Sequence, residues 1–474
     1  MAINTPTIKV AIIGGGPGGL AAAIELGKLP FVSWTLYEKK PQISETGGGI
    51  SLQRHTWRML ELLGADGNIT AGDYFRPEDG HTVQHRNARD GTLLGKSYTP
   101  EDTPPKQASC RMVRPKLQGA LLKEVDQAKI QLSKKLVAIE KLQDGGKLRI
   151  VFEDGFEDEV DLLVGADGIR SAVRQFLFPS HNLSYIGQSA YRTLTSTSAI
   201  SAHLTSKNIE FAPLRGPIFW HNVGGKYVYT CPLGGDVFEV TARIRRLPDG
   251  QDHVSWGQPY DLHHLLSEYE EFCPAVREIL TVAAAEGNTQ EFAMFSGPRL
   301  ERCVGDEDRG EAVALLGDAS HPLSGAFGAG AGFALEDAYT LGKALEWSFG
   351  RRGDGSDKGV DVERAVAEGL RLYDRTRSPH YKDLYGVLDK MGALNAALVK
   401  EGLPVDDEIS ERVKRAWGAK NDWMYYYKAD EIIRLAILEL DRKEGVEEVS
   451  NTVIDGVGNV KLDGSEMVEV RIGI

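Results

Sequence analysis

The sequence is poor in cysteine, and the few cysteines it has are far apart. None belongs to a C-x-x-C pair in the 474 residues. Scattered cysteines are unsuited to a disulfide framework or to a metal site built on paired thiolates. We therefore expect free thiols, a reducing cytoplasmic compartment and no bound metal. The cysteines are Cys110, Cys231, Cys273 and Cys303.

Long apolar runs and an excess of positive charge are also missing. No stretch approaches the roughly 18 consecutive apolar residues of a transmembrane helix, so no membrane span is expected. The N-terminal stretch lacks the basic region that begins a secretory signal peptide. The formal net charge is −13, which argues against nucleic acid or an anionic membrane as a partner.

Glycine, in contrast, is abundant, with 53 residues, and the stretch from Lys9 to Glu38 shows one reason. Val10–Ile13 is a short apolar run rich in β-branched residues, which predicts a buried strand. Glycines with the spacing G-x-G-x-x-G follow, then a predicted helix, Leu20–Gly27, and a second predicted strand, Trp34–Tyr37. This order predicts a dinucleotide-binding β-α-β unit.

The glycines and the acid that follows them have separate expected roles. Gly14 permits the tight turn, Gly16 lets the backbone approach a pyrophosphate, and Gly19 lets the helix pack on the strand. The N-terminus of the helix then points its free N–H groups at the phosphates. Glu38, at the end of the second strand, can accept hydrogen bonds from both ribose hydroxyls and would repel a 2′-phosphate.

Two further features near this unit can belong to the same site. The glycines at 47–49 form a turn that we interpret as lying against a cofactor, although glycines also simply punctuate loops. The spacing of apolar residues predicts a helix over Thr56–Leu63 that ends at Gly64. Another predicted helix has Pro115 in its first turn, and Arg114 stands just ahead of it, placed to reach an anion unless it is only a surface cation.

The architecture is expected to change between Ser189 and Asp249. Short runs of alternating apolar and polar residues predict an antiparallel sheet, with the segment 209–214 as one of its strands. Leu262–Thr281 is then predicted to form one helix.

The C-terminal third begins with another strand, glycine loop and helix. Val313–Leu316 is the predicted strand, Gly317-Asp318 ends it, and the helix is expected over Ala331–Trp347. His321, in the loop, fits a structural hydrogen-bonding role better than a general-base role. Further predictions are an exposed linker at 351–360, a helix over 363–398 broken at Pro379, a helix over 422–440, and a hairpin or partly ordered tail over 450–474.

Three motifs in this order carry a resemblance to a known family. They are G-x-G-x-x-G with Glu38, Asp167-Gly168 with Ser171 and Arg174, and Gly317-Asp318 with 336–338 (Glu-Asp-Ala). The chain resembles the single-component FAD-dependent aromatic monooxygenases, which include salicylate and para-hydroxybenzoate hydroxylases. The aromatic stretch 423–430 is similar to the C-terminal helix of salicylate-hydroxylase-like members, a branch with fungal tailoring enzymes of secondary metabolism.

The resemblance implies an α/β fold with a Rossmann-like FAD-binding domain, a second domain built on an antiparallel substrate sheet, and C-terminal helices. The expected FAD-binding domain is discontinuous, over 1–80, 108–182 and 290–395. The expected substrate domain comprises 81–107 and 183–289, and the C-terminal helical region and tail comprise 396–474. The sequence leaves open whether the chain forms a homodimer.

The resemblance also implies a reaction in which NADH or NADPH docks transiently and reduces FAD. Oxygen then adds to the flavin as a C4a-hydroperoxide, which hydroxylates or epoxidises an electron-rich phenol or indole. Arg192 and Tyr227 are the implied catalytic residues. The implied FAD-binding residues are Gly14, Gly16, Gly19, Glu38, Gly49, Arg114, Asp167, Asp318, Gly330 and Ala331.

Other functions stay open at this point. A decarboxylating hydroxylase of a simple aromatic acid would need a cation in the pocket, and Arg192, Arg215 or Arg243 could supply it. A flavin reductase, a halogenase or a flavin-fold protein without catalysis could share the fold. A larger substrate would need an open aromatic pocket, which Phe219, Trp220, Tyr227 and Phe327 could line.

Three loop residues depart from the family pattern. Gly325 stands where members usually have a proline, Phe327 where the para-hydroxybenzoate branch has a glycine, and Gly332 where an asparagine is common. These departures concern the shape of the substrate pocket.

Overall fold

The structure is a computed structural model that describes most of the chain. The described residues are 7–45, 48–142, 146–245, 256–306, 310–323, 325–351, 361–417, 422–443, 459–460 and 468–469. Gly47, most of the predicted linker at 351–360 and most of the predicted tail at 450–474 lie outside them. Within the tail, β20 (Asn459–Val460) and β21 (Val468–Glu469) pair antiparallel.

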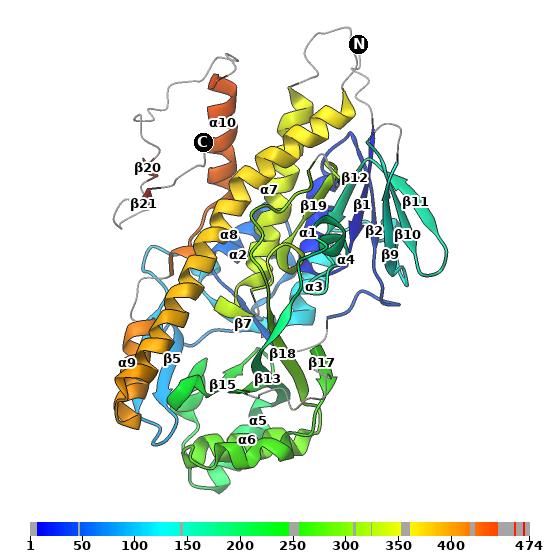
Figure 1. Cartoon of the computed structure of the whole chain (residues 1–474). Coiled ribbons are helices and arrows are strands. Elements are labelled where there is room, and N and C mark those ends of the chain that lie inside the picture. The colour runs from blue at the N-terminus through cyan, green and yellow to red at the C-terminus, as the bar shows by residue number, and fades with distance from the viewer. Residues whose placement is uncertain are drawn as a thin grey trace.

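The molecule has two halves in space, each built on one large sheet. A five-stranded parallel sheet forms the centre of one half (Figure 1). Its strands are nearly all apolar because both faces of the sheet are covered. The predicted β-α-β unit is present at its centre, with α1 (Pro17–Gly27) between the first two strands. In spatial order the strands are β19 (Val313–Leu315), β12 (Leu162–Gly165), β1 (Ile8–Ile13), β2 (Val32–Tyr37) and β8 (Ile130–Gln131).

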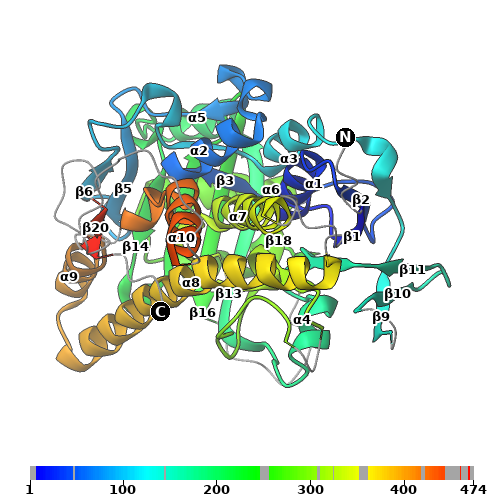
Figure 2. The ribbon, with the colours of Figure 1, turned by 90° about the horizontal axis from the view of Figure 1, so that it is seen from above.

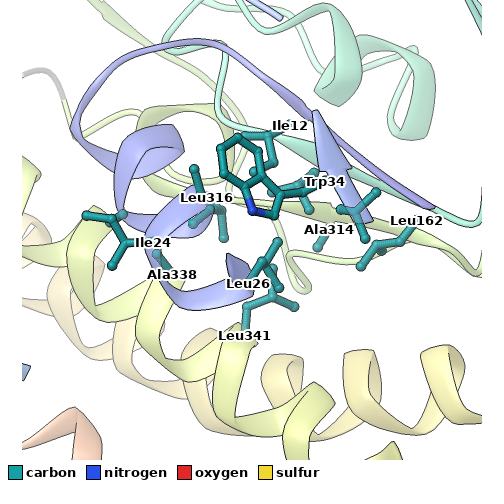
Figure 3. Packing of buried hydrophobic residues seen from close by; sticks show 14 of the residues in the cluster. Ile12, Ile24, Leu26, Trp34, Leu162, Ala314, Leu316, Ala338 and Leu341 are labelled. Carbon is teal, nitrogen blue, oxygen red and sulfur yellow. The ribbon is translucent and has the colours of Figure 1, made fainter. Parts of the chain in front are cut away.

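The main hydrophobic core lies between this sheet and two helices, α1 and α7 (Gly330–Gly350). Figure 3 shows the packing: Ile12 and Leu162 of the strands lie with Leu26 of α1 and Leu341 of α7. All four side chains are fully buried. This core fixes the sheet and the N-terminus of α1 relative to α7.

Two small three-stranded sheets flank the parallel sheet. One has the order β11 (Glu157–Val160), β10 (Leu148–Phe152) and β9 (Leu136–Lys141), and residues 143–145, between β9 and β10, lie outside the described residues. The other has the order β3 (Gly49–Leu52), β7 (Cys110–Val113) and β4 (Tyr74–Phe75). The adjoining helices are α2 (Arg54–Leu63), α3 (Arg114–Leu122) and α4 (Ala172–Leu177).

An eight-stranded sheet forms the second half, with α5 (Thr197–Ser206) and α6 (Pro274–Glu286) packed on its outer face (Figure 1). Its pairs are antiparallel, as predicted, except that β14 pairs with β5 in parallel. In spatial order the strands are β17 (Trp256–Pro259), β18 (Gln290–Ser296), β13 (Ser184–Ser196), β16 (Val237–Arg245), β15 (Tyr227–Pro232), β14 (Ile218–His221), β5 (His81–Asn87) and β6 (Leu93–Tyr98).

Three details of this half differ from the sequence predictions. The segment 209–214 is not a strand, because Pro213 cannot donate to a ladder and Ala212–Leu214 forms a short 3-10 helix. The helix predicted over Leu262–Thr281 is interrupted at Cys273, since Pro274 disfavours a helical residue before it. Finally, β18 begins at Gln290 and pairs with β13, so the eight-stranded sheet continues to Ser296.

The C-terminal region is built on one long helix, α8 (Val362–Glu401), followed by α9 (Val405–Trp417) and α10 (Ala429–Lys443). The predicted break at Pro379 is absent. Packing of the flanking buried residues Arg377 and Tyr381 outweighs the hydrogen bond that the proline removes. Figure 2 shows α8 running past α7 and α10 to α9.

Two other observations concern these helices. The predicted helix over 422–440 begins later, because a 3-10 turn (Asp422–Tyr425) precedes α10. Although α8 has 40 residues, no helix in the described parts of the chain combines the length and the apolar character that crossing a membrane requires.

A buried ionic cluster joins α7 to α8. Arg377 of α8 donates through Nε to Asp337 (2.7 Å) and through Nη2 to Glu336 (2.9 Å), and all three side chains are at most 1% exposed. Burial raises the pKa of Glu336 from its ordinary 4.5 to about 8, although the charge of Arg377 opposes the shift. Two carboxyl groups thus share one arginine, and Glu336 keeps its proton.

Glu336 should make the fold less stable as the pH rises. Between about pH 5 and pH 8 the folded chain holds a proton on Glu336 that the unfolded chain releases, so the free energy of unfolding falls across this range. The side chain in Glu336→Gln is permanently uncharged, so this variant should lack that part of the decline in the free energy of unfolding. Urea unfolding at four pH values measures the difference. Glu270→Gln, on an exposed side chain, is the control, and parallel curves for wild type and Glu336→Gln would contradict the prediction.

Candidate active site

A single cleft of about 1940 Å³ runs between the two halves of the molecule. The carboxyl ends of β1, β2 and β12 open into it, which is where open parallel sheets bind ligands. Its other walls are the inner face of the eight-stranded sheet and one face of α8. The cleft therefore brings together residues from nearly the whole chain.

The glycine loop after β1 forms one wall of the cleft. Gly14 and Gly16 line it, and Gly14 has φ +107°, with no room for a side chain beside the Ala166 carbonyl. Gly19 lies behind this wall, where an added Cβ would overlap the Gly14 carbonyl. Gly19 therefore allows α1 to pack against the loop, and the loop leaves its backbone open to the cleft.

Glu38 lies at the end of β2 with its carboxylate fixed by backbone amides. Oε2 accepts from the Gly15 amide at 2.7 Å and Oε1 from the Lys40 amide at 2.9 Å. Each carboxylate oxygen has a second lone pair, so Glu38 can accept further bonds from the cleft that it lines. Its position suits a pair of ribose hydroxyls.

Asp318 and Asp167 differ in the hydrogen bonds that the protein makes to their carboxylates. Asp167 accepts from Ser171 Oγ and from the Ala172 amide (2.7 Å), so it caps the start of α4 although it also borders the cleft. The Asp318 carboxylate has no hydrogen-bond partner among the described residues and is open to the cleft. The surrounding protein raises the pKa of Asp318, against the charges of Arg114 and Arg174.

The Asp318 loop is held from two sides. Arg174 is buried and donates through Nη1 to the carbonyls of Asp318 and Ala319, at 3.0 Å each. Asp337 accepts from the Gly317 amide at 2.7 Å and from Tyr381 Oη at 2.6 Å. These bonds explain why the second and third sequence motifs occur together.

Arg114 and the start of α7 border the cleft beside the glycine loop. Arg114 lines the cleft, its Nη1 lies 3.5 Å from Glu45, and its buried Nε has no partner within the described chain. Gly330 and Ala331, at the N-terminus of α7, also line the cleft. A bare glycine backbone, an unpaired carboxylate, an orphaned arginine nitrogen and a helix N-terminus together fit the phosphates and hydroxyls of FAD.

A pair that sequence reasoning missed lies between the two halves. Glu239 of β16 accepts from the Gly49 amide at 2.8 Å and forms an ion pair with Arg111 of β7. Burial opposes the ionisation of Glu239, but Arg111 and Arg192 outweigh it, so the pKa of Glu239 is lowered. Gly49 lines the cleft, but its amide is already used by Glu239. The period-two alternation of β16 could have placed Glu239 on the face with Thr241 and Arg243.

Arg192 of β13 and Tyr227 of β15 both face the cleft from the eight-stranded sheet. Arg192 makes no hydrogen bond or ion pair with any described residue, and its guanidinium lies 5.0 Å from the Phe292 ring centre. Burial lowers the pKa of Arg192. Tyr227 accepts a hydrogen bond from Arg243 Nη1 at 3.0 Å.

Successive side chains of a strand point to opposite faces of the sheet, so only some of the other residues predicted for the pocket line the cleft. Phe219 and Arg243 line the cleft, but Trp220 points to the opposite face, where it is 1% exposed and donates to Thr230 Oγ1 at 3.0 Å. Arg215 is exposed and does not line the cleft. His321 is also absent from the wall: it stacks on Tyr381 with ring centres 3.7 Å apart, and burial lowers its pKa to about 3. Its surroundings favour a structural role.

The loop before α7 accounts for two of the three departures from the family pattern, Gly325 and Gly332, but not for Phe327. Gly325 has φ +69°, which proline cannot adopt. A side chain at Gly332 would overlap His55 and Thr56. Phe327 has φ +65°, a left-handed conformation that suits glycine, and its carbonyl accepts a hydrogen bond from Tyr425 Oη at 3.0 Å.

Tyr425 should stabilise the left-handed conformation of Phe327. Tyr425→Phe removes this hydrogen bond and should lower the free energy of unfolding by about 1 kcal/mol. When the bond is lost, the Phe327 loop can relax from its strained φ +65°, whereas a Phe327→Gly loop has no strain to release, so the loss should be larger in the Phe327→Gly background. Urea unfolding of the four proteins measures this coupling, with Tyr98→Phe on an exposed tyrosine as control. Equal losses in both backgrounds would refute the coupling.

Comparisons with known proteins agree with this geometry. The family model described as an FAD binding domain matches residues 7–365. A salicylate hydroxylase of Pseudomonas putida is 26% identical over 422 residues, 84% of this chain and 91% of that protein. The FAD-dependent monooxygenase sor5 of Hypocrea jecorina (strain QM6a) is 26% identical over 467 residues, 92% of this chain and 95% of that protein.

A solved structure has the same fold. It is a salicylate hydroxylase substrate complex that superimposes with a TM-score of 0.71 at 22% identity and covers 91% of this chain and 98% of its own. This likeness confirms the predicted α/β class. From the match over residues 7–365, the chain belongs to the FAD binding domain family, and it is an FAD-dependent monooxygenase, an oxidoreductase.

Proposed function

We propose that the enzyme uses NADH or NADPH and O₂ to hydroxylate or epoxidise an electron-rich aromatic substrate of phenolic or indole type. The observation that carries this proposal is the continuity of the cleft from the glycine loop to the eight-stranded sheet. Its volume of about 1940 Å³ exceeds the roughly 300–1,000 Å³ of a pocket for one small ligand. FAD and an aromatic substrate therefore have room to lie in contact.

The cofactor half is assigned to residues that offer unused polar groups. The proposal places the pyrophosphate at Gly14 and Gly16, with Glu38 at the adenosine ribose and Asp318 at the ribitol chain. Arg114 and the α7 N-terminus supply positive potential, and Gly19, Gly49 and Asp167 support the backbone around them. When bound, FAD supplies the transfer of electrons from the nicotinamide to O₂.

The substrate half is assigned to the inner face of the eight-stranded sheet, formed by residues 81–107 and 183–296. Arg192 can donate to an oxygen of the substrate, because no described residue uses its guanidinium. Even when burial lowers its pKa, a guanidinium stays charged near neutral pH, so it acts as a fixed donor. Tyr227 of β15, held by its hydrogen bond from Arg243, orients the aromatic ring of the substrate.

A second candidate reaction is decarboxylating hydroxylation of a simple aromatic acid. The observation in its favour is that Arg243 faces the cleft and has only neutral partners among the described residues, Tyr227 and Gln188, the latter at 2.6 Å. A guanidinium without a carboxylate partner can bind the carboxylate of a substrate.

The decisive experiment follows NADH and NADPH oxidation by the FAD-loaded enzyme with phenols, salicylates and indoles, while peroxide and product are measured. Oxidation stimulated by one class with oxygen incorporated and little peroxide is the expected result. Release of carbon dioxide from salicylate would instead establish the decarboxylating reaction. Failure of both nucleotides to reduce the bound FAD would refute the proposed function.

Arg192→Gln should test the proposed donor. Removing the charge should lower kcat/KM for the best substrate by about 10²–10³-fold and divert oxygen to peroxide, while FAD stays bound. Arg215→Gln is the matched control, because Arg215 is exposed and outside the cleft. Equal activity of the two variants would remove Arg192 from the catalytic proposal.

A further inference from the structure

The cleft extends well beyond the residues assigned to FAD, along one face of α8. From Leu388 to Val399 most of its lining residues recur three or four positions apart, so they lie on one side of the helix. From Leu388 to Val399 this face extends about 16 Å at 1.5 Å per residue. Tyr385, just before it, is close enough to Asp318 and Arg174 for their charges to influence its ionisation. The face thus begins at the cofactor end and leads away from it.

The far part of this face forms a groove with the neighbouring elements. We call it the distal groove and define it by Met391, Gly392, Ala396 and Val399 of α8, Trp417 of α9, and Phe219 and His221 of β14, all of which line the cleft. Figures 1 and 2 show α8 meeting α9 beside β5, which pairs with β14.

Apolar side chains in the distal groove are exposed to solvent. Val399 is 66% exposed and Trp417 is 39% exposed. When an apolar group covers apolar side chains in a cleft, the free energy of the system falls, because apolar surface is removed from water. The groove is therefore suited to an uncharged, apolar ligand group.

Aromatic rings form the wall opposite α8. The Trp417 ring centre lies 5.1 Å from Phe219 and 4.6 Å from His85. His85 and His221 share a hydrogen bond of 2.9 Å between Nδ1 and Nε2, so one imidazole uses the other as its partner. Burial lowers the pKa of both histidines, which are uncharged near neutral pH.

Hydrogen bonds hold the groove in place and engage the charged side chain at this end. Arg412 of α9 donates to Glu408 at 2.6 Å and to Asn395 of α8. Glu408 also accepts from the Gly224 amide at 3.1 Å, which ties α9 to the eight-stranded sheet. Both Nη atoms of Arg412 thus have partners and only its buried Nε has none within the described chain, whereas Arg192 near the cofactor end makes no hydrogen bond with a described residue.

We infer that the substrate is an aromatic compound with a sizeable uncharged apolar substituent, and that this substituent lies in the distal groove. The inference rests on the proposed function, which places the reacting ring beside Arg192. The argument for this occupant is continuity, since the groove and the reaction site are parts of one cleft. An unsubstituted monocyclic acid would leave Val399 and Trp417 facing water.

The test uses the FAD-loaded enzyme and three resorcinols that carry a methyl, propyl or pentyl chain at the same ring position. Their dissociation constants are measured by the change in flavin absorbance, which does not require turnover. Each added methylene should tighten binding about threefold to fourfold if it is buried in the groove. Equal affinities for the three compounds would overturn the inference.

Two variants locate the chain in the groove. Val399→Asp places a charge on the groove wall and should reduce the preference for pentyl over methyl roughly tenfold, and Trp417→Ala should also reduce it. Val405→Asp is the matched control, because Val405 is an exposed valine of α9 outside the cleft and should keep the full preference. A preference that keeps its wild-type size in both groove variants would place the substituent elsewhere.

Thermal unfolding distinguishes a ligand groove from a surface covered by protein. Val399→Asp should leave the melting temperature of the enzyme without ligand as little changed as Val405→Asp does, since both side chains are exposed. A marked drop confined to Val399→Asp would mean that the chain's own C-terminal residues or a second copy fills the groove, which overturns the inference.

The outcomes also separate this inference from the proposed function. A chain-length preference that Val399→Asp reduces and Val405→Asp does not supports the groove even if no resorcinol stimulates NAD(P)H oxidation. Stimulated oxidation with product formation but no chain-length preference supports the monooxygenase and refutes the apolar substituent.

Discussion

The structure depends on one buried carboxylate. Asp337 accepts hydrogen bonds from the Gly317 amide, from Arg377 and from Tyr381, so it joins the end of β19 to α7 and α8. This arrangement fixes the backbone that presents Asp318, the start of α7 and the direction of α8. A buried carboxylate without these donors would be strongly destabilising, which explains why an arginine is kept in the core.

The two halves of the cleft divide the chemistry between them. On the parallel-sheet side, backbone amides, a helix N-terminus and single charges line the cleft and are suited to a polar ligand. On the eight-stranded side, alternate residues of each strand face the cleft, while their neighbours such as Trp220 fill the core behind. A polar cofactor and an aromatic substrate can therefore share one space without sharing residues.

The sequence predicted the parts of the site that depend on local pattern. The glycine spacing, the strand ends at Glu38 and Gly317, and the start of α7 follow from short-range geometry, and the structure has all of them. It did not predict the pairing of β14 with β5 or the link from Arg111 to Glu239, because these join segments more than 100 residues apart. Continuity of α8 through Pro379 was missed for a related reason, since burial of Arg377 and Tyr381 against α7 is a tertiary effect.

The dispersed origin of the cleft walls has a thermodynamic consequence. The lining runs from Ile13 to Tyr426, so a ligand in the cleft contacts elements from both sheets and the C-terminal helices at once. A ligand that binds only the folded chain raises the free energy of unfolding of all these elements together. The increase is about 2.7 kcal/mol when the free ligand concentration is a hundred times Kd. By this linkage, the supply of FAD in the cell affects two properties of the enzyme. It affects the fraction of the chain that is unfolded and open to proteolysis, and it affects the rate of catalysis.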